Sequence, residues 1–139
     1  MARQWIHENP PRWDAPKAAI VGAAPKGSLP PTPYSAGDAI PGEWWRVEED
    51  GRVVGYGWMD TTWNGGEILL AVHSEHGGQG VGGFILDHLE AEAKKRGLNY
   101  LYNVVQDAHP RRAEVTRWLE HHGFKGGEDG QLRRQVPKG

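Results

Sequence analysis

Five glycines fall within seven residues in the middle of the chain, at Gly77, Gly78, Gly80, Gly82 and Gly83. The segment before them has the composition of a β-strand, and the segment after them repeats its apolar residues at helical spacing. Glycine lets a backbone approach a ligand closely, and the first N–H groups of a helix are unpaired donors at the positive end of its dipole. The unit therefore predicts a site for an anionic phosphate, with a flexible glycine-rich loop as the plainer alternative.

Three strands are expected before this turn, at residues 44–48, 52–62 and 67–73, because these segments are rich in Trp, Val, Ile and Tyr. An Asp-Gly pair at 50–51 and an Asn-Gly-Gly run at 64–66 separate them. Such pairs supply the positive φ angles that tight hairpins require, so the three strands are expected to form an antiparallel meander.

The remaining elements alternate between helix and strand. An amphipathic helix of about four turns is expected over residues 84–96, with Gly97 as its end. A buried strand at 100–105 and a helix at 111–122 follow, and a weaker strand pair lies within 124–136. This order predicts an α+β fold with a mixed sheet.

The first forty residues have a different character, because eight of the ten prolines lie at or before Pro41. Proline interrupts regular elements, so only a short strand at 4–7 and a short helix capped by Asp14 and reaching residue 23 are expected. The length suits one domain, 1–139, with a Pro-rich arm at 1–42 and a sheet core at 43–136.

Composition excludes several classes of function. Sixteen basic against eighteen acidic residues give a net charge of −2, which leaves no broad positive field for nucleic acid. There is no cysteine, hence no disulfide, thiolate metal site or cysteine nucleophile, and no metal is expected. No apolar run approaches the roughly 20 residues that span a bilayer, and no signal peptide is visible, so a cytoplasmic protein without membrane contact is expected.

The glycines alone do not decide which phosphate ligand binds. Gly78, Gly80 and Gly83 satisfy the letters of the dinucleotide fingerprint, but that fold needs parallel strands alternating with helices, whereas an antiparallel meander is expected here. Asp107 would be a poorly placed ribose ligand. A Walker loop is excluded because no Gly-Lys-Ser/Thr ends the turn.

Residues 72–86, Val-His-Ser-Glu-His-Gly-Gly-Gln-Gly-Val-Gly-Gly-Phe-Ile-Leu, resemble the GNAT superfamily of N-acetyltransferases, and the element order agrees with that family over about two-thirds of the chain. In that family a Gln/Arg-x-x-Gly-x-Gly/Ala stretch binds the pyrophosphate of acetyl-CoA through main-chain amides. Gly80 and Gly82 match the motif, and Gly77 stands at the Gln/Arg position. The resemblance implies acetyl-CoA as cosubstrate, bound by Gly77, Gly78, Gly80, Val81, Gly82 and Gly83.

The resemblance also implies a place for the chemistry. In the family the last meander strand and the strand after the helix splay apart around the thioester, so Ala71 and Val72 are expected to bind the cofactor. A backbone N–H near Val72 would stabilise the oxyanion. Glu67 and His73 share one face of their strand at period two and are the candidate bases.

The candidate acids are less well defined, because Leu119 stands where the family often has a tyrosine. Tyr100, Tyr102 or His109 would supply the proton, or the thiolate would leave unassisted. His121 and His122 are interpreted as helix C-terminal residues that interact with the helix dipole.

The main hypothesis is an N-acetyltransferase acting on a primary amine of unknown identity. The alternatives are a catalytically weak or inactive acyl-CoA-binding module and, less favoured, a dinucleotide-binding domain. Trp44 and Trp45 are expected on opposite sheet faces. The arm before them is placed either to fold over an acceptor pocket or to bind a second subunit in a homodimer.

Overall fold

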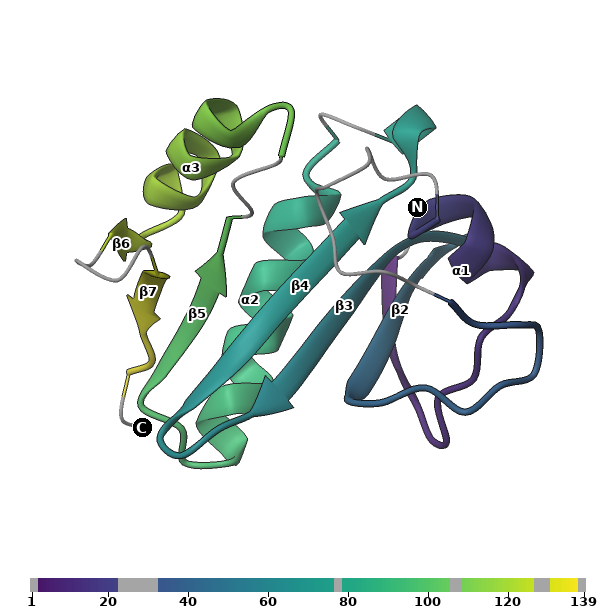
Figure 1. Cartoon of the computed structure of the whole chain (residues 1–139), viewed down its shortest axis with the longest axis horizontal. Coiled ribbons are helices and arrows are strands. Elements are labelled where there is room, and N and C mark those ends of the chain that lie inside the picture. Colours follow the sequence, from purple (N-terminus) through teal and green to yellow (C-terminus); the bar gives the residue numbers. More distant parts are fainter. Residues whose placement is uncertain (1–2, 23–32, 77–78, 106–108, 127–130, 138–139) are drawn as a thin grey trace.

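The computed structural model describes residues 3–22, 33–76, 79–105, 109–126 and 131–137 (Figure 1). Seven strands form one sheet in the order β1-β2-β3-β4-β5-β7-β6. The elements are β1 (Arg3–Glu8), α1 (Ala15–Ile20), β2 (Glu43–Glu49), β3 (Arg52–Thr61), β4 (Gly65–Val72), η1 (Ser74–His76), α2 (Val81–Lys95), β5 (Tyr100–Val104), α3 (Arg112–His121), β6 (Lys125–Gly126) and β7 (Gln131–Gln135). The α+β class and the antiparallel meander of β2, β3 and β4 are confirmed.

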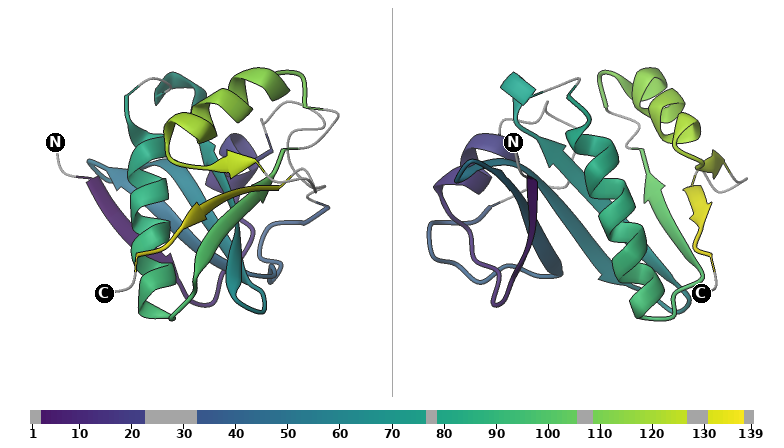
Figure 2. Two further views of the ribbon diagram at one scale, coloured as in Figure 1. Left: turned by 90° about the vertical axis from the view of Figure 1, so that its left-hand side faces the viewer. Right: turned by 180° about the vertical axis from the view of Figure 1, so that it is seen from behind.

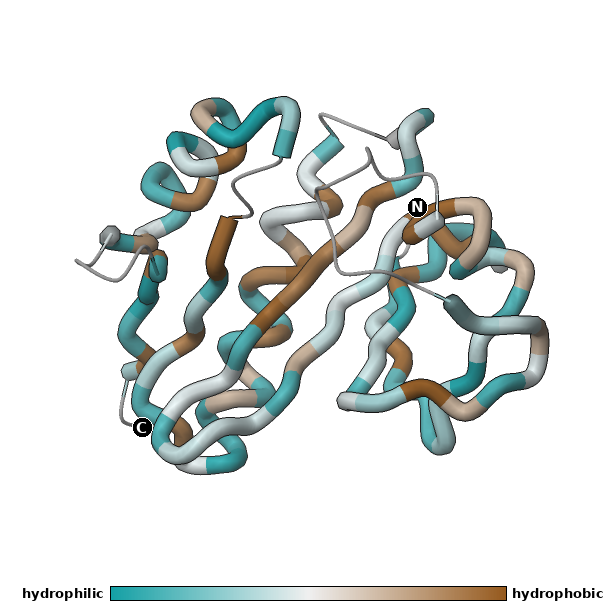
Figure 3. Tube along the Cα trace, in the orientation of Figure 1, coloured by the Kyte–Doolittle hydropathy of each residue, from teal (hydrophilic) through white to brown (hydrophobic). Residues whose placement is uncertain are grey.

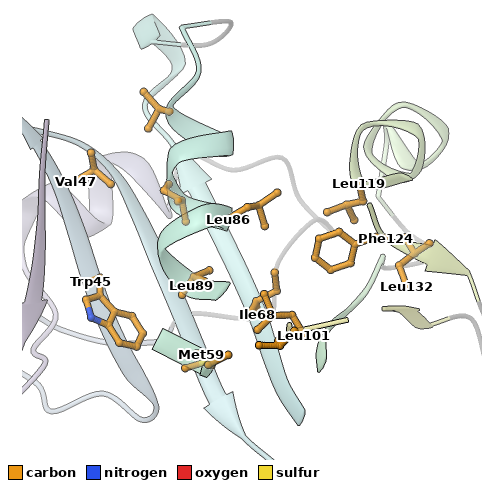
Figure 4. Packing of buried hydrophobic residues seen from close by; sticks show 14 of the residues in the cluster. Trp45, Val47, Met59, Ile68, Leu86, Leu89, Leu101, Leu119, Phe124 and Leu132 are labelled. Carbon is orange, nitrogen blue, oxygen red and sulfur yellow. The ribbon is translucent and has the colours of Figure 1, made fainter. Parts of the chain in front are cut away.

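The sheet separates two apolar clusters. On one face α2 and α3 cover the larger cluster, which includes Leu86 and Leu89 of α2 and Leu119 of α3 (Figure 4). On the other face α1 and the arm cover a smaller cluster, and Figure 2 shows α1 and α2 on opposite sides of the strands. Trp44 belongs to the α1 cluster and Trp45 to the α2 cluster, so the expected division of these two side chains is confirmed.

Only β4 and β5 pair in parallel, and the other neighbours are antiparallel. The alternating parallel strands of a dinucleotide-binding domain are therefore not present in the described sheet. The middle of β4 is strongly apolar and lies at the centre of the molecule (Figure 3).

Of the two predicted hairpin turns, the one at Asp50-Gly51 is confirmed and the one at 64–66 is not. Asp50 and Gly51 have φ angles of 52° and 79°, which confirms the first. The second was wrong in detail, because Gly65 and Gly66 do not turn but begin β4. A Cβ on Gly65 would lie 2.5 Å from the Tyr100 ring, so this glycine is required for close packing and not for a positive φ.

The N-terminal arm contains the strand and the helix that were expected. Asp14 caps α1 by accepting a hydrogen bond from Lys17 N at 3.0 Å, and the helix ends at Ile20, before the expected residue 23, which lies outside the described residues. Residues 24–32 also lie outside them, and 33–42 are irregular apart from a bridge between Ala39 and Arg12. Whether the arm binds a second subunit stays a prediction.

The remaining helices follow the expected pattern, with Gly97 and Gly123 at positive φ after α2 and α3. The closing hairpin of β6 and β7 is present, while its expected turn at 129–130 lies outside the described residues. Within the described ranges no helix is both long enough and apolar enough to cross a bilayer.

Candidate functional site

A gap opens in the sheet between β4 and β5. The two strands pair at only three positions, Gly65 with Tyr100, Gly66 with Leu101 and Glu67 with Tyr102. Beyond Glu67 they diverge, as Figure 1 shows, while β4 continues to Val72 along β3. The splayed strands that the sequence resemblance implied are therefore present.

The side chain of Asn103 marks the closed end of the gap. Its Nδ2 donates to the carbonyl oxygen of Ile68 at 2.8 Å, at the first β4 position that has no β5 partner. Successive residues of a strand direct their backbone groups to opposite sides. Because Ile68 faces the gap, Leu70 and Val72 face it too.

The alternating direction of the β4 backbone groups distinguishes between Ala71 and Val72, the two residues expected to bind the cofactor. His73 N donates to Val54 O at 2.8 Å, so the odd-numbered residues at this end direct their backbone groups toward β3. Ala71 stands opposite Tyr56 of β3, and its backbone groups point away from the gap. Of the two predicted residues, Val72 therefore directs its N–H and C=O into the gap and Ala71 does not, and Leu70, which was not predicted, directs its groups there too.

The N-terminus of α2 lies at the open end of the gap (Figure 1). Gly80 is the N-cap, with φ 80°, and the helix begins at Val81. The N–H groups of Val81, Gly82 and Gly83 occupy the first turn, where a helix has no internal acceptor for them. The predicted phosphate donors at 80–83 are thus brought together, whereas Gly77 and Gly78 lie outside the described residues.

Two of the glycines have a packing role that the sequence did not reveal. A Cβ on Gly82 would lie 2.9 Å from Cζ2 of Trp118, and one on Gly83 would lie 3.4 Å from Cε1 of His122. Trp118 and His122 are four residues apart on α3, and their rings are 4.4 Å apart. The density of glycines is therefore explained partly by the close approach of α3 and not by a ligand alone.

Glu67 and Tyr102 lie side by side at the closed end of the gap, because they are register partners. Asp60 of β3 stands directly opposite Glu67 on the other side. These residues face away from α2, since Ile68 and Leu70 point into the cluster that α2 covers. Neither carboxylate has an ion-pair partner among the described residues, and two like charges in this position repel each other.

The two candidate histidines lie at the other end of the strands. His73 follows β4 and is about 20 Å from Glu67 along the chain, at about 3.3 Å per residue, so the two candidate bases are far apart. Its Nδ1 accepts a hydrogen bond from Glu75 N at 3.1 Å, and Nδ1 of His109 accepts one from Arg111 N at 2.9 Å. A neutral ring in this arrangement carries its proton on Nε2, so both histidines can donate a hydrogen bond through that atom.

The structure also shows where Leu119, Tyr100 and His122 lie. Leu119 is 3% exposed and belongs to the core, so that position provides no acid. The Tyr100 ring lies over Gly65, with the Arg133 guanidinium 4.9 Å from its centre. His122 is the C-cap of α3, as expected of a helix C-terminal residue.

Tyr56, on the β3 strand beside Ala71, is the one phenol whose ionisation is clearly perturbed among the described residues. Burial raises the pKa of Tyr56 far above its ordinary value, and the negative charges of Asp14 and Glu8 raise it further. This phenol stays protonated at neutral pH. Across the described residues, no group of three or more His, Asp or Glu side chains could hold a metal ion.

Comparisons with known proteins agree with this geometry. The model of the acetyltransferase (GNAT) domain matches residues 41–126. The fold is similar to the ribosomal-protein-S18-alanine N-acetyltransferase from Escherichia coli, with 19% identity, a TM-score of 0.56 and coverage of 69% of this chain and 70% of that one. No curated protein matches the chain in sequence.

Structures of two similar proteins contain coenzyme A. One is N-acetylglutamate synthase from Neisseria gonorrhoeae, in complex with coenzyme A and N-acetylglutamate, with 20% identity, a TM-score of 0.60 and coverage of 68% of this chain and 26% of that one. The other is the PaiA N-acetyltransferase from Thermoplasma acidophilum, with 16% identity, a TM-score of 0.57 and coverage of 66% and 59%. Together with the domain match over more than half of its length, the splayed sheet shows that this chain belongs to the GNAT acetyltransferases.

Proposed function

We propose that the protein transfers an acetyl group from acetyl-CoA to a primary amine by direct attack. The observation that carries this proposal is the gap between β4 and β5, which opens beyond Glu67 and ends at the N-terminus of α2. Such a gap leaves one edge of β4 free to bind an extended ligand.

The cofactor would use backbone groups along its length. Its pyrophosphate would accept hydrogen bonds from the N–H groups at the start of α2, where the helix dipole favours negative charge. The pantetheine amides would pair with Leu70 and Val72, in the place that a neighbouring strand would otherwise take. The coenzyme A complexes of the Neisseria and Thermoplasma proteins support this choice of ligand.

The reaction requires a neutral amine. Its nitrogen lone pair attacks the thioester carbonyl carbon, the C–N bond forms, and the carbonyl oxygen becomes an oxyanion that a backbone N–H facing the gap would stabilise. The intermediate then collapses with cleavage of the C–S bond. The amine loses one proton to a base, and the thiolate of coenzyme A gains one.

Glu67 is the proposed base. It is half-buried at the closed end of the gap, beside Tyr102, and its side chain has no ion-pair partner among the described residues. Asp60 next to it adds a second negative charge, which would attract the ammonium form of the acceptor before deprotonation. An amine acceptor fits this pair of carboxylates better than a hydroxyl acceptor would.

His73 and His109 follow the carboxyl ends of β4 and β5, at the other end of the strands from Glu67, so neither is assigned as the donor to the leaving thiolate. The backbone hydrogen bonds to Nδ1 favour the neutral tautomer with the proton on Nε2, which donates a hydrogen bond but is not a general acid. A thiol has a pKa of about 8.5, so the thiolate is a good leaving group without assistance.

Substitution of Glu67 tests the catalytic proposal. Glu67→Gln should lower kcat by about 10²–10⁴-fold, because the amine would lose its general base. The measurement is the release of coenzyme A thiol from acetyl-CoA across a panel of amines. Glu120→Gln, on the exposed side of α3, is the matched control and should leave the rate unchanged.

A catalytically inactive acyl-CoA-binding module is the second candidate, favoured by the buried Leu119 at the position of the missing tyrosine. It predicts that wild-type protein binds acetyl-CoA but releases no thiol with any amine. An equal rate for Glu67→Gln and wild type would instead show that the enzyme is active with a different base.

A further inference from the structure

The first described residue, Arg3, contacts the glycine-rich turn from the far end of the sequence. Arg3 opens β1 and is the register partner of Glu49 on β2. Its Nε lies 2.6 Å from Glu49 Oε2, which orients the guanidinium. Its Nη2 donates to the carbonyl oxygen of Gln79, 76 positions away and immediately before the N-cap of α2.

Two further contacts place the guanidinium against the turn. Its central carbon lies 5.8 Å from the centre of the Phe84 ring, in the first turns of α2. Its Nη1 lies 3.6 Å from the point that a Cβ on Gly80 would occupy. Arg3 therefore lies against Gln79, the N-cap residue Gly80 and the first turns of α2.

The turn needs such a contact because its own residues provide little rigidity. Gly80 has a φ of 80° and no side chain, and glycine loses more backbone freedom on ordering than any other residue. A ligand that binds a loosely held turn must supply the free energy of this ordering. Position 77, where the sequence resemblance expects Gln or Arg, is a glycine and has no side chain for a contact of that kind.

We propose that Arg3 is a positioning residue for the cofactor site, which holds the Gln79 carbonyl so that the N–H groups at the start of α2 are already directed toward the pyrophosphate. This inference rests on the proposed function. The arrangement needs a planar group that reaches a carboxylate and a carbonyl at once, which arginine provides and lysine does not. Because Glu49 offsets the charge of Arg3, orientation and not net charge is the important contribution.

The test compares coenzyme A with pantetheine, which lacks the pyrophosphate and adenosine. Affinities are measured by calorimetry for coenzyme A and by NMR titration for pantetheine. Arg3→Ala and Arg3→Lys should both weaken coenzyme A binding by about tenfold and change pantetheine binding by less than about twofold. Arg12→Ala is the matched control, because Arg12 also donates to a backbone carbonyl, that of Gly37 at 3.1 Å, but far from the turn.

Three results would overturn the inference. Full coenzyme A affinity in Arg3→Lys would show that charge alone is sufficient. An equal loss for both ligands in Arg3→Ala would show a general effect on the fold, which thermal unfolding of the same variant would report. Failure of the wild-type protein to bind coenzyme A at all would refute the proposed function first, and that result is seen before any variant is measured.

Discussion

Asn103 of β5 holds the carbonyl oxygen of Ile68 on β4 at 2.8 Å, where the backbones of the two strands separate. The side chain thereby replaces one strand-to-strand hydrogen bond and determines where the gap begins. Without it, the Ile68 carbonyl at the closed end of the gap would lose its partner in the described structure.

Substitution of Asn103 should therefore destabilise the fold in a graded way. Asn103→Ala should lower the free energy of unfolding by about 1 kcal/mol, because one hydrogen bond is lost. Asn103→Asp should cost more, since a carboxylate would face a carbonyl oxygen. Urea unfolding measures both, with the exposed Asn99→Ala as control. Equal stability of Asn103→Asp and wild type would contradict this role.

Gly82 and Gly83 should respond differently to alanine. At Gly82 the new Cβ would lie 2.9 Å from the Trp118 ring, so Gly82→Ala should lower the melting temperature despite the higher helix propensity of alanine. At Gly83 the nearest atom is 3.4 Å away on His122, and Gly83→Ala should be neutral or stabilising by up to about 1 kcal/mol.

A second substitution, at Trp118, tests whether the contact with α3 causes the effect of Gly82→Ala. Trp118→Leu should relieve the clash, so that Gly82→Ala costs less in the Trp118→Leu background than in wild type. Thermal unfolding of wild type, the two single variants and the double variant gives the coupling energy directly. A coupling near zero would mean that the Gly82 effect arises in the turn and not in the contact with α3.

Lys17 and Glu8 form a buried ion pair that joins α1 to β1. Lys17 is fully buried, and its Nζ lies 2.5 Å from Glu8 Oε1 and 3.2 Å from Asp14 Oδ2. Lys17→Met should destabilise the protein by about 3–5 kcal/mol, because it leaves a buried carboxylate with less compensation. The double variant with Glu8→Gln should recover part of the loss in chemical denaturation. A double variant no more stable than Lys17→Met would argue against a charge effect.

The buried Tyr56 phenol should make the protein sensitive to alkali. Its pKa is raised by burial above the ordinary value of 10.0, so the unfolded state loses this proton more readily than the folded state. Its contribution to stability is fully present below about pH 10 and is lost as the pH rises above that value. Tyr56→Phe should therefore flatten the fall in melting temperature between about pH 10 and 12. An unchanged slope would show that other groups dominate.

Local signals in the sequence were sufficient for most of the elements. Asp50-Gly51 adopts the positive φ angles of a hairpin because both residues tolerate them, whatever surrounds the turn. The helix α2 ends as expected, with Lys94 and Lys95 in its last turn and Gly97 at φ 71°.

The role of other glycines was not apparent, because it depends on residues distant in sequence. Gly65 looked like a turn residue, but the Tyr100 ring packs on it. Gly82 was predicted to contact a ligand, which stays a prediction, and Trp118 additionally occupies the space where its Cβ would lie. The sequence alone does not distinguish a glycine that adopts a turn conformation from one that binds a ligand or one that leaves space for a neighbouring side chain.

Propensities and motifs that span a few residues were enough to predict the order of strands and helices, the family resemblance and the glycine-rich start of α2. The folded chain was needed to learn which backbone groups face the gap, that Glu67 pairs with Tyr102, and that Arg3 reaches Gln79. This division arises because register and side-chain contacts form between segments that meet only when the sheet closes, where packing selects one arrangement among many that the local sequence allows.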